Sequence, residues 1–336
     1  MQQPAENLAT ITEHEVVHGP SFIDGDKGKG KGNSSTLRPP RTDLTIASFE
    51  LGGKLGSGQF GHVHLARHRA TDYICALKLI SKADCVKGGQ EEMVRRELEV
   101  HTNLAHANIL RIFAWFHDND NICLVLEYAP NGTLFSLLGK QPERRFSESM
   151  TATYISQIAQ GLRYMHRKNI IHRDIKPENI LLGFHHEIKL ADFGWSVHSV
   201  SNLRSTVCGT IDYLAPEIAI MLTKPGKTDQ WYTNAVDQWS LGVLTYELLT
   251  GRTPFETWDA EATKRRIAEF KGMVRFPQHV SKAAEDFIKQ LLNLDAEKRL
   301  GLSEVLQHPW ILGHVARSEK TGLRSLHYLL EEALDD

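Results

Sequence analysis

Hydrophobic and polar positions change their period along the chain near residue 130. Before that point, FELGGKLGSGQFGHVHLARH from Phe49 and YICALKLI from Tyr73 are short runs with glycines and apolar residues, which is typical of strands. NICLVLEYA at 121–129 predicts a buried strand, whereas EEMVRRELEVHTNL at 91–104 lacks Gly and Pro and predicts a helix. We therefore expect a small antiparallel sheet with one main helix.

Beyond Pro130 the pattern favours helices. Apolar residues recur near helical spacing over 151–165, a largely buried helix is predicted over 236–251 with its end at Gly251, and 283–293 is amphipathic. The sequence thus predicts an α+β, bilobal fold with an N-lobe at 49–129, a C-lobe at 130–312 and a short C-terminal extension at 313–336. Such an arrangement places a cleft where the lobes meet.

The start of the chain lacks any such periodicity. Residues 1 to about 44 include SFIDGDKGKGKGNSSTLRPPR, which is rich in Gly, Lys, Ser and Pro. A segment of this composition cannot bury enough apolar surface to offset the entropy lost on ordering. We expect residues 1–44 to be a disordered N-terminal tail.

Composition and charge narrow the class of protein. A hydrophobic content of 41%, a charged content of 24% and a net charge of −2 are ordinary for a soluble globular chain, and they predict no direct nucleic-acid partner and no membrane partner. The four cysteines form no CxxC pair, which argues against a disulfide framework or a zinc cluster and favours a reducing compartment. No apolar run of about 18 residues and no signal-like N-terminus occurs, so we expect neither membrane insertion nor secretion.

A glycine-rich stretch, GSGQFGHV at 56–63, fits the pattern G-x-G-x-x-G-x-V. The glycine spacing alone is equally compatible with an ordinary turn. A dinucleotide-binding loop requires a strand before the glycines and a helix after them, but here both flanks look like strands. This context favours a hairpin that closes over phosphates.

Lys78 lies in the apolar run CALK, where burying an unpaired charge would be costly. Glu97 on the predicted helix can supply the anionic partner, which leaves the ammonium group to orient the α- and β-phosphates of a nucleotide. The alternative is a lysine that extends to solvent at a strand edge, with Glu97 an unrelated surface residue.

HRDIKPEN at 172–179 holds the groups that phosphoryl transfer requires. Asp174 is the candidate base that orients and deprotonates a hydroxyl, Lys176 is suited to neutralise the moving phosphoryl group, and Asn179 to hold one magnesium ion. Asp192 of Asp192-Phe193-Gly194 is the second candidate metal ligand. ENILLG and HEIKLAD between them predict a strand pair that carries Asn179 and Asp192 towards one mouth. Coincidental surface charges are the alternative, but five ordered motifs argue against it.

The motifs above, in this order and followed by APE at 215–217, make residues 49–312 resemble a eukaryotic protein kinase domain. The resemblance implies that Glu217 pairs with Arg299 and that Asp237 of DQWSLG braces the backbone of the catalytic loop. Lys176 lies two residues after the candidate base, and Gly209-Thr210 precede APE. Both features resemble serine/threonine kinases.

ADFGWSVHSVSNLRSTVCGTIDYLAPE, HANIL and LEYAPNGTL resemble the Aurora family, with Trp195 the most specific match. The resemblance implies an activating phosphorylation at Thr206, with candidate arginine partners at Arg173, Arg96 and Arg204. A solvated Thr206, or modification of Ser205 instead, are alternatives. The chain departs from the family at Ala215, where Aurora kinases usually have proline, and in a longer segment at 219–236, for which we expect a surface loop.

The resemblance also implies a binding site for ATP and Mg²⁺. Backbone groups of Glu127 and Ala129 would bind adenine, beside Leu126, while Val63, Ala76 and Leu182 would enclose the ring. The full nucleotide set that the resemblance implies is Leu55, Gly56, Gly58, Gly61, Val63, Ala76, Lys78, Glu127, Ala129, Glu178, Asn179, Leu182 and Asp192.

Glu178 and Glu247 fall where kinases that prefer basic substrates place two carboxylates around an arginine. We therefore expect arginine at the −2 position of the substrate, although either glutamate could instead be a structural ion-pair partner. The resemblance implies protein substrates such as histone tails, kinetochore and spindle proteins, together with an inner-centromere-type scaffold or a spindle activator. It further implies a role in chromosome segregation, in nucleus and cytoplasm, at centromere and spindle during mitosis. The alternatives are another basophilic serine/threonine kinase and a pseudokinase scaffold.

Overall fold

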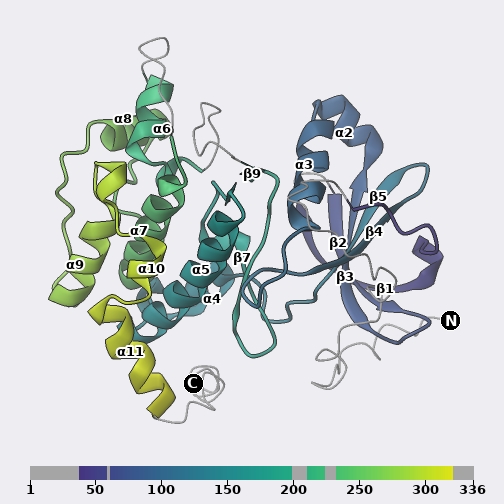
Figure 1. Ribbon diagram of the computed structural model, residues 1–336, viewed down its shortest axis with the longest axis horizontal. Helices are drawn as coiled ribbons and strands as arrows, with labels where there is room; N and C mark the ends of the chain where they lie inside the picture. The colour runs from purple at the N-terminus through teal and green to yellow at the C-terminus, as the bar shows by residue number, and fades with distance from the viewer. Residues whose placement is uncertain (1–37, 59–60, 199–209, 224–231, 321–336) are drawn as a thin grey trace. The chain divides into compact units, whose positions relative to one another are not determined.

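The structure, a computed structural model, describes residues 38–58, 61–198, 210–223 and 232–320. The chain divides into two compact units (Figure 1). The smaller unit, here the N-lobe, comprises the residues up to Ala105 and Leu110–Pro130. The larger unit, here the C-lobe, comprises His106–Ile109 and the chain from Asn131 onwards. The predicted α+β class is confirmed, since the first unit is built on an antiparallel sheet and the second on helices.

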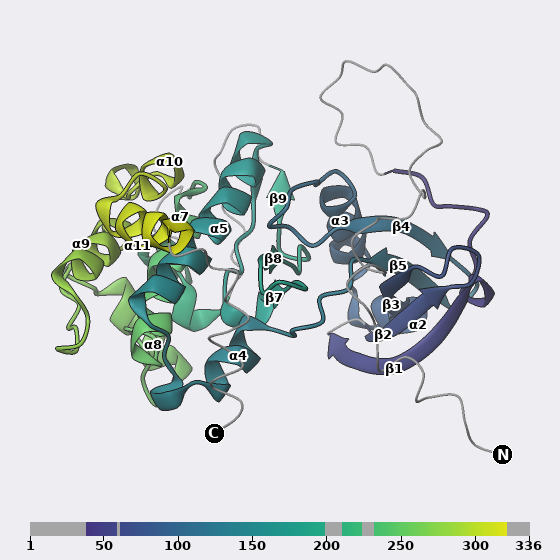
Figure 2. The same cartoon turned by 90° about the horizontal axis from the view of Figure 1, so that it is seen from below.

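One antiparallel sheet organises the N-lobe, with its strands in the order β1-β2-β3-β5-β4 (Figure 2). Two helices, α2 and α3, follow β3. Along β3, Cys75 and Leu77 are fully buried in a core with Phe49 and Phe116, which leaves the alternate residues on the opposite face. The bounds are β1 (Phe49–Gly58), β2 (Gly61–His68), β3 (Ile74–Ser81), α2 (Lys82–Gly88), α3 (Glu91–His101), β4 (Ile112–His117) and β5 (Asn121–Leu126).

The N-lobe begins earlier in the chain than the sequence indicated. Trp115 Nε1 donates to the carbonyl of Arg38 at 2.7 Å, and the amide of Arg41 donates to the carbonyl of Trp115 at 2.8 Å. Leu44 is 6% exposed within the core. The prediction of disorder is therefore wrong for residues 38–44, because these residues gain hydrogen bonds and burial from β4, which is distant in sequence. Residues 1–37 lie outside the described residues.

Helices build the C-lobe around the buried α7, which ends as predicted at Gly251, a residue with φ of 80°. The predicted helices at 151–165, 236–251 and 283–293 are present as α5, α7 and α9, and the strand pair predicted before Asp192 is present as β7 and β8. The described helices all lack the length and apolar content that a membrane crossing requires. The helices are α4 (Leu134–Lys140), α5 (Glu148–Arg167), α6 (Pro216–Thr223), α7 (Ala235–Thr250), α8 (Ala260–Ala268), α9 (Lys282–Leu291), α10 (Leu302–Val305) and α11 (Pro309–Lys320). The short strands are β6 (Ile170–Ile171), β7 (Ile180–Leu182), β8 (Ile188–Leu190) and β9 (Val197–His198).

Two boundaries of the predicted lobes differ from the structure. Residues 106–109 belong to the C-lobe: Ile109 forms a parallel bridge with Leu190, and the side-chain amide of Asn108 donates to the carbonyl of Ile188 at 3.2 Å. Helix α11 continues past residue 312, the predicted end of the C-lobe. Both differences arise because a local pattern does not show which distant strand or helix a segment will join.

Candidate active site

In the N-lobe, strand register places the candidate nucleotide-binding residues on one face of the sheet. Val63 pairs with Lys78, and Ala76 pairs with Leu126. Residues directly opposite each other in an antiparallel pair project from the same face, and alternate residues along one strand do too. Val63, Ala76, Lys78 and Leu126 therefore share the face opposite the Cys75 and Leu77 core.

The ion pair predicted for Lys78 is present on this face. Lys78 Nζ lies 2.6 Å from Glu97 Oε1, and the Glu97 residue is 3% exposed. Helix α3 supplies Glu97 with a buried apolar side that includes Val94 and Leu98, which fixes the rotation of the helix. Because the pair is largely withdrawn from water, the alternative of a solvent-directed lysine with an unrelated glutamate is wrong.

The glycine-rich stretch forms a β1–β2 hairpin, with Gly58 opposite Gly61. A Cβ on Gly61, whose φ is +158°, would lie 1.8 Å from the carbonyl oxygen of Leu79, so β3 itself excludes a side chain there. A Cβ on Gly56 would meet no atom within 4 Å. Packing therefore explains Gly61, whereas the open surroundings of Gly56 leave its backbone accessible to a ligand. Residues 59 and 60 lie outside the described residues.

At the end of β5, the predicted adenine-binding segment is held by Arg111. The amide of Glu127 donates to the carbonyl of Arg111 at 2.8 Å, and a carboxylate oxygen of Glu127 accepts from the amide of Arg111 at 3.0 Å. The Ala129 amide, in contrast, donates to no backbone carbonyl of the described residues and is partly exposed. That amide is available to an adenine nitrogen.

In the C-lobe, Asp237 on α7 holds the catalytic loop through its backbone. Its two carboxylate oxygens accept from the amides of His172 at 2.9 Å and Arg173 at 2.8 Å, and His166 Nε2 lies 2.8 Å away. Asp237 is fully buried, which favours the neutral acid, but the hydrogen bond from His166 and the charges of both histidines outweigh burial and lower the pKa of Asp237. Arg173 has φ of 72°, a costly conformation for a residue with a side chain. The Asp237 carboxylate stabilises it.

Asp174 lies at the centre of a hydrogen-bonded group. Its carboxylate accepts from Thr210 Oγ1 at 2.8 Å and Asn179 Nδ2 at 2.7 Å, and Lys176 Nζ lies 2.9 Å away. Lys176 also donates to Thr210 Oγ1 at 2.7 Å. Burial disfavours the ionised carboxylate, but the hydrogen bond and charge of Lys176 and the Thr210 hydroxyl outweigh it and lower the pKa of Asp174. Asp174 is thus held ionised, as a proton acceptor must be.

Asn179 directly precedes β7 and Asp192 follows β8, so both lie beyond the same end of this antiparallel pair, where the amide of Ala191 donates to the carbonyl of Asn179 at 2.9 Å. The Asn179 side-chain amide is oriented by Asp174, because its Nδ2 donates to both the carbonyl and the carboxylate of Asp174. The amide oxygen remains for a cation. Asp192 is exposed and has φ of 63°. Amide and carboxylate oxygens form the donor set that Mg²⁺ prefers, so these residues fit such an ion.

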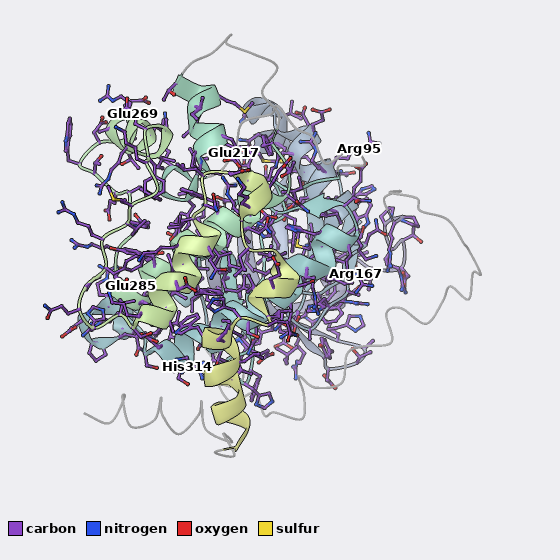
Figure 3. The ribbon with its side chains drawn as sticks, turned by 60° about the vertical axis from the view of Figure 1, so that its left-hand side comes forward. Arg95, Arg167, Glu217, Glu269, Glu285 and His314 are labelled. Carbon is purple, nitrogen blue, oxygen red and sulfur yellow. The ribbon has the colours of Figure 1, made fainter. Side chains whose placement is uncertain are left out.

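The ion pair that the kinase resemblance implied between Glu217 and Arg299 is bidentate, with two N–O distances of 2.7 Å. Arg299 also donates to the carbonyls of Asn293 and Ala235, and its guanidinium lies 5.2 Å from the ring centroid of Trp239. Figure 3 labels Glu217 at the start of α6. Arg299 therefore links the start of α6, through Glu217, to the start of α7, through Ala235.

Comparison with known proteins agrees with this geometry. The protein kinase domain family matches residues 49–311. An Aurora kinase of Schizosaccharomyces pombe is 48% identical over 320 residues, which cover 90% of this chain and 87% of the relative. One from Yarrowia lipolytica is 49% identical over 80% of this chain and 70% of its own length, and Aurora kinase C of Mus musculus is 45% identical over 82% and 96%.

The chain belongs to the Aurora family of protein kinases. It is an ATP-dependent serine/threonine kinase with protein substrates. Membership of the protein kinase family also implies a divalent metal ion together with ATP.

The carboxylates considered for substrate recognition in this Aurora kinase form part of a larger acidic cluster: Glu178, Asp212, Glu247 and Glu256. Burial, and then the charges of the other three residues, raise the pKa of Glu247 to about 7, although a hydrogen bond from the Tyr213 hydroxyl opposes the rise. Burial and the charges of Glu256 and Glu178 also raise the pKa of Asp212. Unrelieved repulsion of this kind favours a cationic ligand. Glu247 has a structural partner in Tyr213, but that partner is neutral.

The activation segment of the Aurora kinase is described only in part. Thr206, Ser205 and Arg204 lie outside the described residues. Arg173 Nε donates to the carbonyl of Trp195 at 2.6 Å, and its Nη1 donates to the Tyr232 hydroxyl at 2.7 Å. The surface loop expected at 219–236 is wrong at both ends, because 219–223 are helical in α6 and 235–236 begin the buried α7. Residues 224–231 lie outside the described residues.

Sequence reasoning missed three residues that contact the catalytic groups. Thr210 bonds both Asp174 and Lys176, His166 bonds Asp237, and Tyr213 bonds Glu247. Thr210 and Tyr213 lie in the CGTIDYLAPE stretch that carried the family resemblance, so a signal was present. His166 gave none, because a histidine near the end of a helix is common.

Proposed function

We propose that this Aurora kinase phosphorylates serine or threonine in basic sequences, with arginine at the −2 position. The acidic cluster carries the proposal, since Glu247 and Asp212 are each repelled by neighbouring acidic groups and a guanidinium group would relieve this repulsion. Glu178 is exposed, so it can contact a substrate arginine at the surface. Glu247 is partly buried, so an ion pair between it and the arginine would be shielded from water.

The proposed roles of the individual residues follow from their contacts. Asp174, ionised and hydrogen-bonded on both oxygens, orients the substrate hydroxyl and accepts its proton. Lys176 stabilises negative charge beside it, and Lys78, held by Glu97, orients phosphate oxygens. Asn179 and Asp192 would hold Mg²⁺, which when bound neutralises phosphate charge. The remaining residues of the nucleotide set are proposed to enclose ATP.

Peptide kinetics test this proposal. A peptide with arginine two residues before a serine should be phosphorylated, whereas the same peptide with alanine in that place should show a KM raised at least tenfold. Asp192→Asn provides an inactive control for contaminating kinases. Equal KM values for the two peptides would overturn the arginine preference and leave the kinase activity standing.

The proposed cellular role is chromosome segregation, with substrates such as histone tails, kinetochore and spindle proteins and an inner-centromere-type scaffold or spindle activator. Similarity to Aurora kinases from yeasts and a mouse supports it. Imaging of a tagged copy through cell division should show a label in nucleus and cytoplasm that gathers at centromeres or the spindle during mitosis. A label spread evenly through the cytoplasm at every stage would contradict the role.

A further inference from the structure

A groove in the C-lobe lies outside the catalytic residues. It has a volume of about 890 Å³ and is formed by the loop after α7, the end of α8 and the loop before α9. This volume lies within the range of pockets that bind ligands, about 300–1,000 Å³. None of the residues assigned to ATP, metal or phosphate transfer lines it.

Aromatic side chains make a fixed floor for the groove. Phe255 is 2% exposed, stacks on Trp239 at 5.5 Å, and meets Phe270 edge to face at 5.0 Å. The opposite wall is tied to α7, since the Tyr246 hydroxyl donates to the carbonyl of Arg275 at 3.0 Å. The groove is therefore built in advance rather than opened by a ligand.

The rim of the groove combines positive charge with exposed apolar surface. Three exposed arginines line it, Arg252, Arg266 and Arg275, against one exposed acidic residue, Glu256. Within the described ranges, none of the three forms an ion pair, and Arg266 donates only to a backbone carbonyl, that of Glu256. Met273 on the same rim is 85% exposed. An acidic segment with an aromatic or aliphatic side chain satisfies both features.

The groove is continuous with the proposed substrate surface through Glu256. The backbone of Glu256 contacts Arg266 in the groove, while its carboxylate charge acts on Glu247 and Asp212 in the acidic cluster. Glu256 therefore belongs to both surfaces, which lie next to each other on the C-lobe. The two surfaces have opposite charge, so one would select the phosphorylation site and the other a different part of the same substrate.

We propose that this groove, rimmed by Arg252, Arg266 and Arg275, is a docking site for an acidic, aromatic-containing segment of protein substrates. Substrates would then be bipolar, with basic residues around the target serine or threonine and an acidic segment elsewhere in the chain. This proposal rests on the proposed basic specificity and extends it.

A direct binding experiment separates the docking site from catalysis. The probe is a fluorescent peptide, Glu-Asp-Phe-Leu-Glu-Glu, added to the kinase of residues 1–336, with anisotropy as the readout. We expect saturable binding that is weakened at least tenfold in Arg252→Glu/Arg275→Glu. Arg265→Glu is the matched control, because Arg265 is exposed on α8 but does not line the groove. If the probe does not bind, or binds the Arg252→Glu/Arg275→Glu variant with unchanged affinity, the proposal is overturned.

Kinetics then test whether docking serves substrates. The same acidic segment is joined by a flexible linker to the basic peptide, and raised effective concentration should lower KM about tenfold with kcat unchanged. The double reversal should abolish the advantage without altering KM for the basic peptide alone. If the basic peptide is a substrate but the joined peptide has no advantage, docking fails and the proposed function stands. If the probe binds but neither peptide is phosphorylated, the proposed function fails instead.

Residues 326–336, LHYLLEEALDD, have the same acidic and apolar chemistry and are the competing occupant within this chain. A variant of the 336-residue chain with Glu331→Gln, Glu332→Gln, Asp335→Asn and Asp336→Asn tests them. If the groove binds substrates, the probe affinity of this variant should be unchanged. A several-fold gain in probe affinity would show that the chain's own segment fills the groove, and would overturn a substrate docking role.

Discussion

Loss of the Glu217 charge should destabilise the C-lobe far more than loss of a glutamate whose cationic partners are exposed. Arg299 has a fully buried side chain, and in Glu217→Gln its guanidinium would keep its backbone partners but lose its counter-ion. Removing one member of a buried ion pair costs about 3–5 kcal/mol. Since the Glu217 side chain is 23% exposed and glutamine still accepts a hydrogen bond, we expect about 3 kcal/mol, more than a hundredfold in the unfolding equilibrium.

Urea denaturation followed by far-UV circular dichroism measures this change. Glu285→Gln is the control, with Glu285 labelled on α9 in Figure 3. Its side chain is 12% exposed, but its partners Lys282 and Lys289 are 91% and 49% exposed, so water screens both pairs. Screened pairs of this kind contribute little to stability. The slope of unfolding free energy against urea should stay constant, which would show that the substitution changes the free energy of unfolding and not the surface exposed on unfolding.

A double variant separates charge loss from packing. Glu217→Leu/Arg299→Met removes both charges, so it should recover part of the loss seen in Glu217→Leu alone. Recovery should be incomplete, because the carbonyls of Asn293 and Ala235 lose the donors that Arg299 provides. Equal stability losses in Glu217→Gln and Glu285→Gln would refute the reasoning.

Three further expectations concern the catalytic loop, substrate recognition and the glycine hairpin. Asp237→Asn offers one acceptor to two backbone amides, so we expect a stability loss of about 2 kcal/mol and a lower kcat with KM for ATP little changed; an unchanged kcat would contradict the bracing role. Because the pKa of Glu247 is about 7, its carboxylate is mostly protonated below that pH and mostly ionised above it, so KM for an arginine-containing peptide should fall as pH rises from about 6 to 8. An alanine-containing peptide should lack this dependence, and a parallel fall for both peptides would exclude Glu247 as its source. Gly61→Ala forces a Cβ against Leu79 and should lower Tm by several degrees, whereas Gly56→Ala, with open space around it, should not; matching Tm values would disprove the steric argument.

Much of the fold followed from local patterns in the sequence. The helices α5, α7 and α9 and the β7–β8 pair were predictable because period and glycine position act over a few residues. A counter-charge for Lys78 could be predicted because a charge in an apolar strand is costly to leave unpaired. Of the four glutamates on the predicted helix at 91–104, the kinase pattern points to Glu97. The motif at 172–179 showed its chemistry directly, since phosphoryl transfer needs those functional groups in whatever fold carries them.

Only the tertiary structure decided which distant groups meet. Residues 38–44 look disordered by composition but pack on β4, and residues 106–109 join the C-lobe through Leu190. Thr210 reaches Asp174, and three separate acidic residues gather around Glu247, only because helices and loops from different parts of the chain converge. The sequence determined the elements and the reactive groups, because these depend on local spacing and side-chain chemistry. Burial, shared hydrogen bonds and shifted pKa values depend on non-local packing, and that packing is set by the fold as a whole.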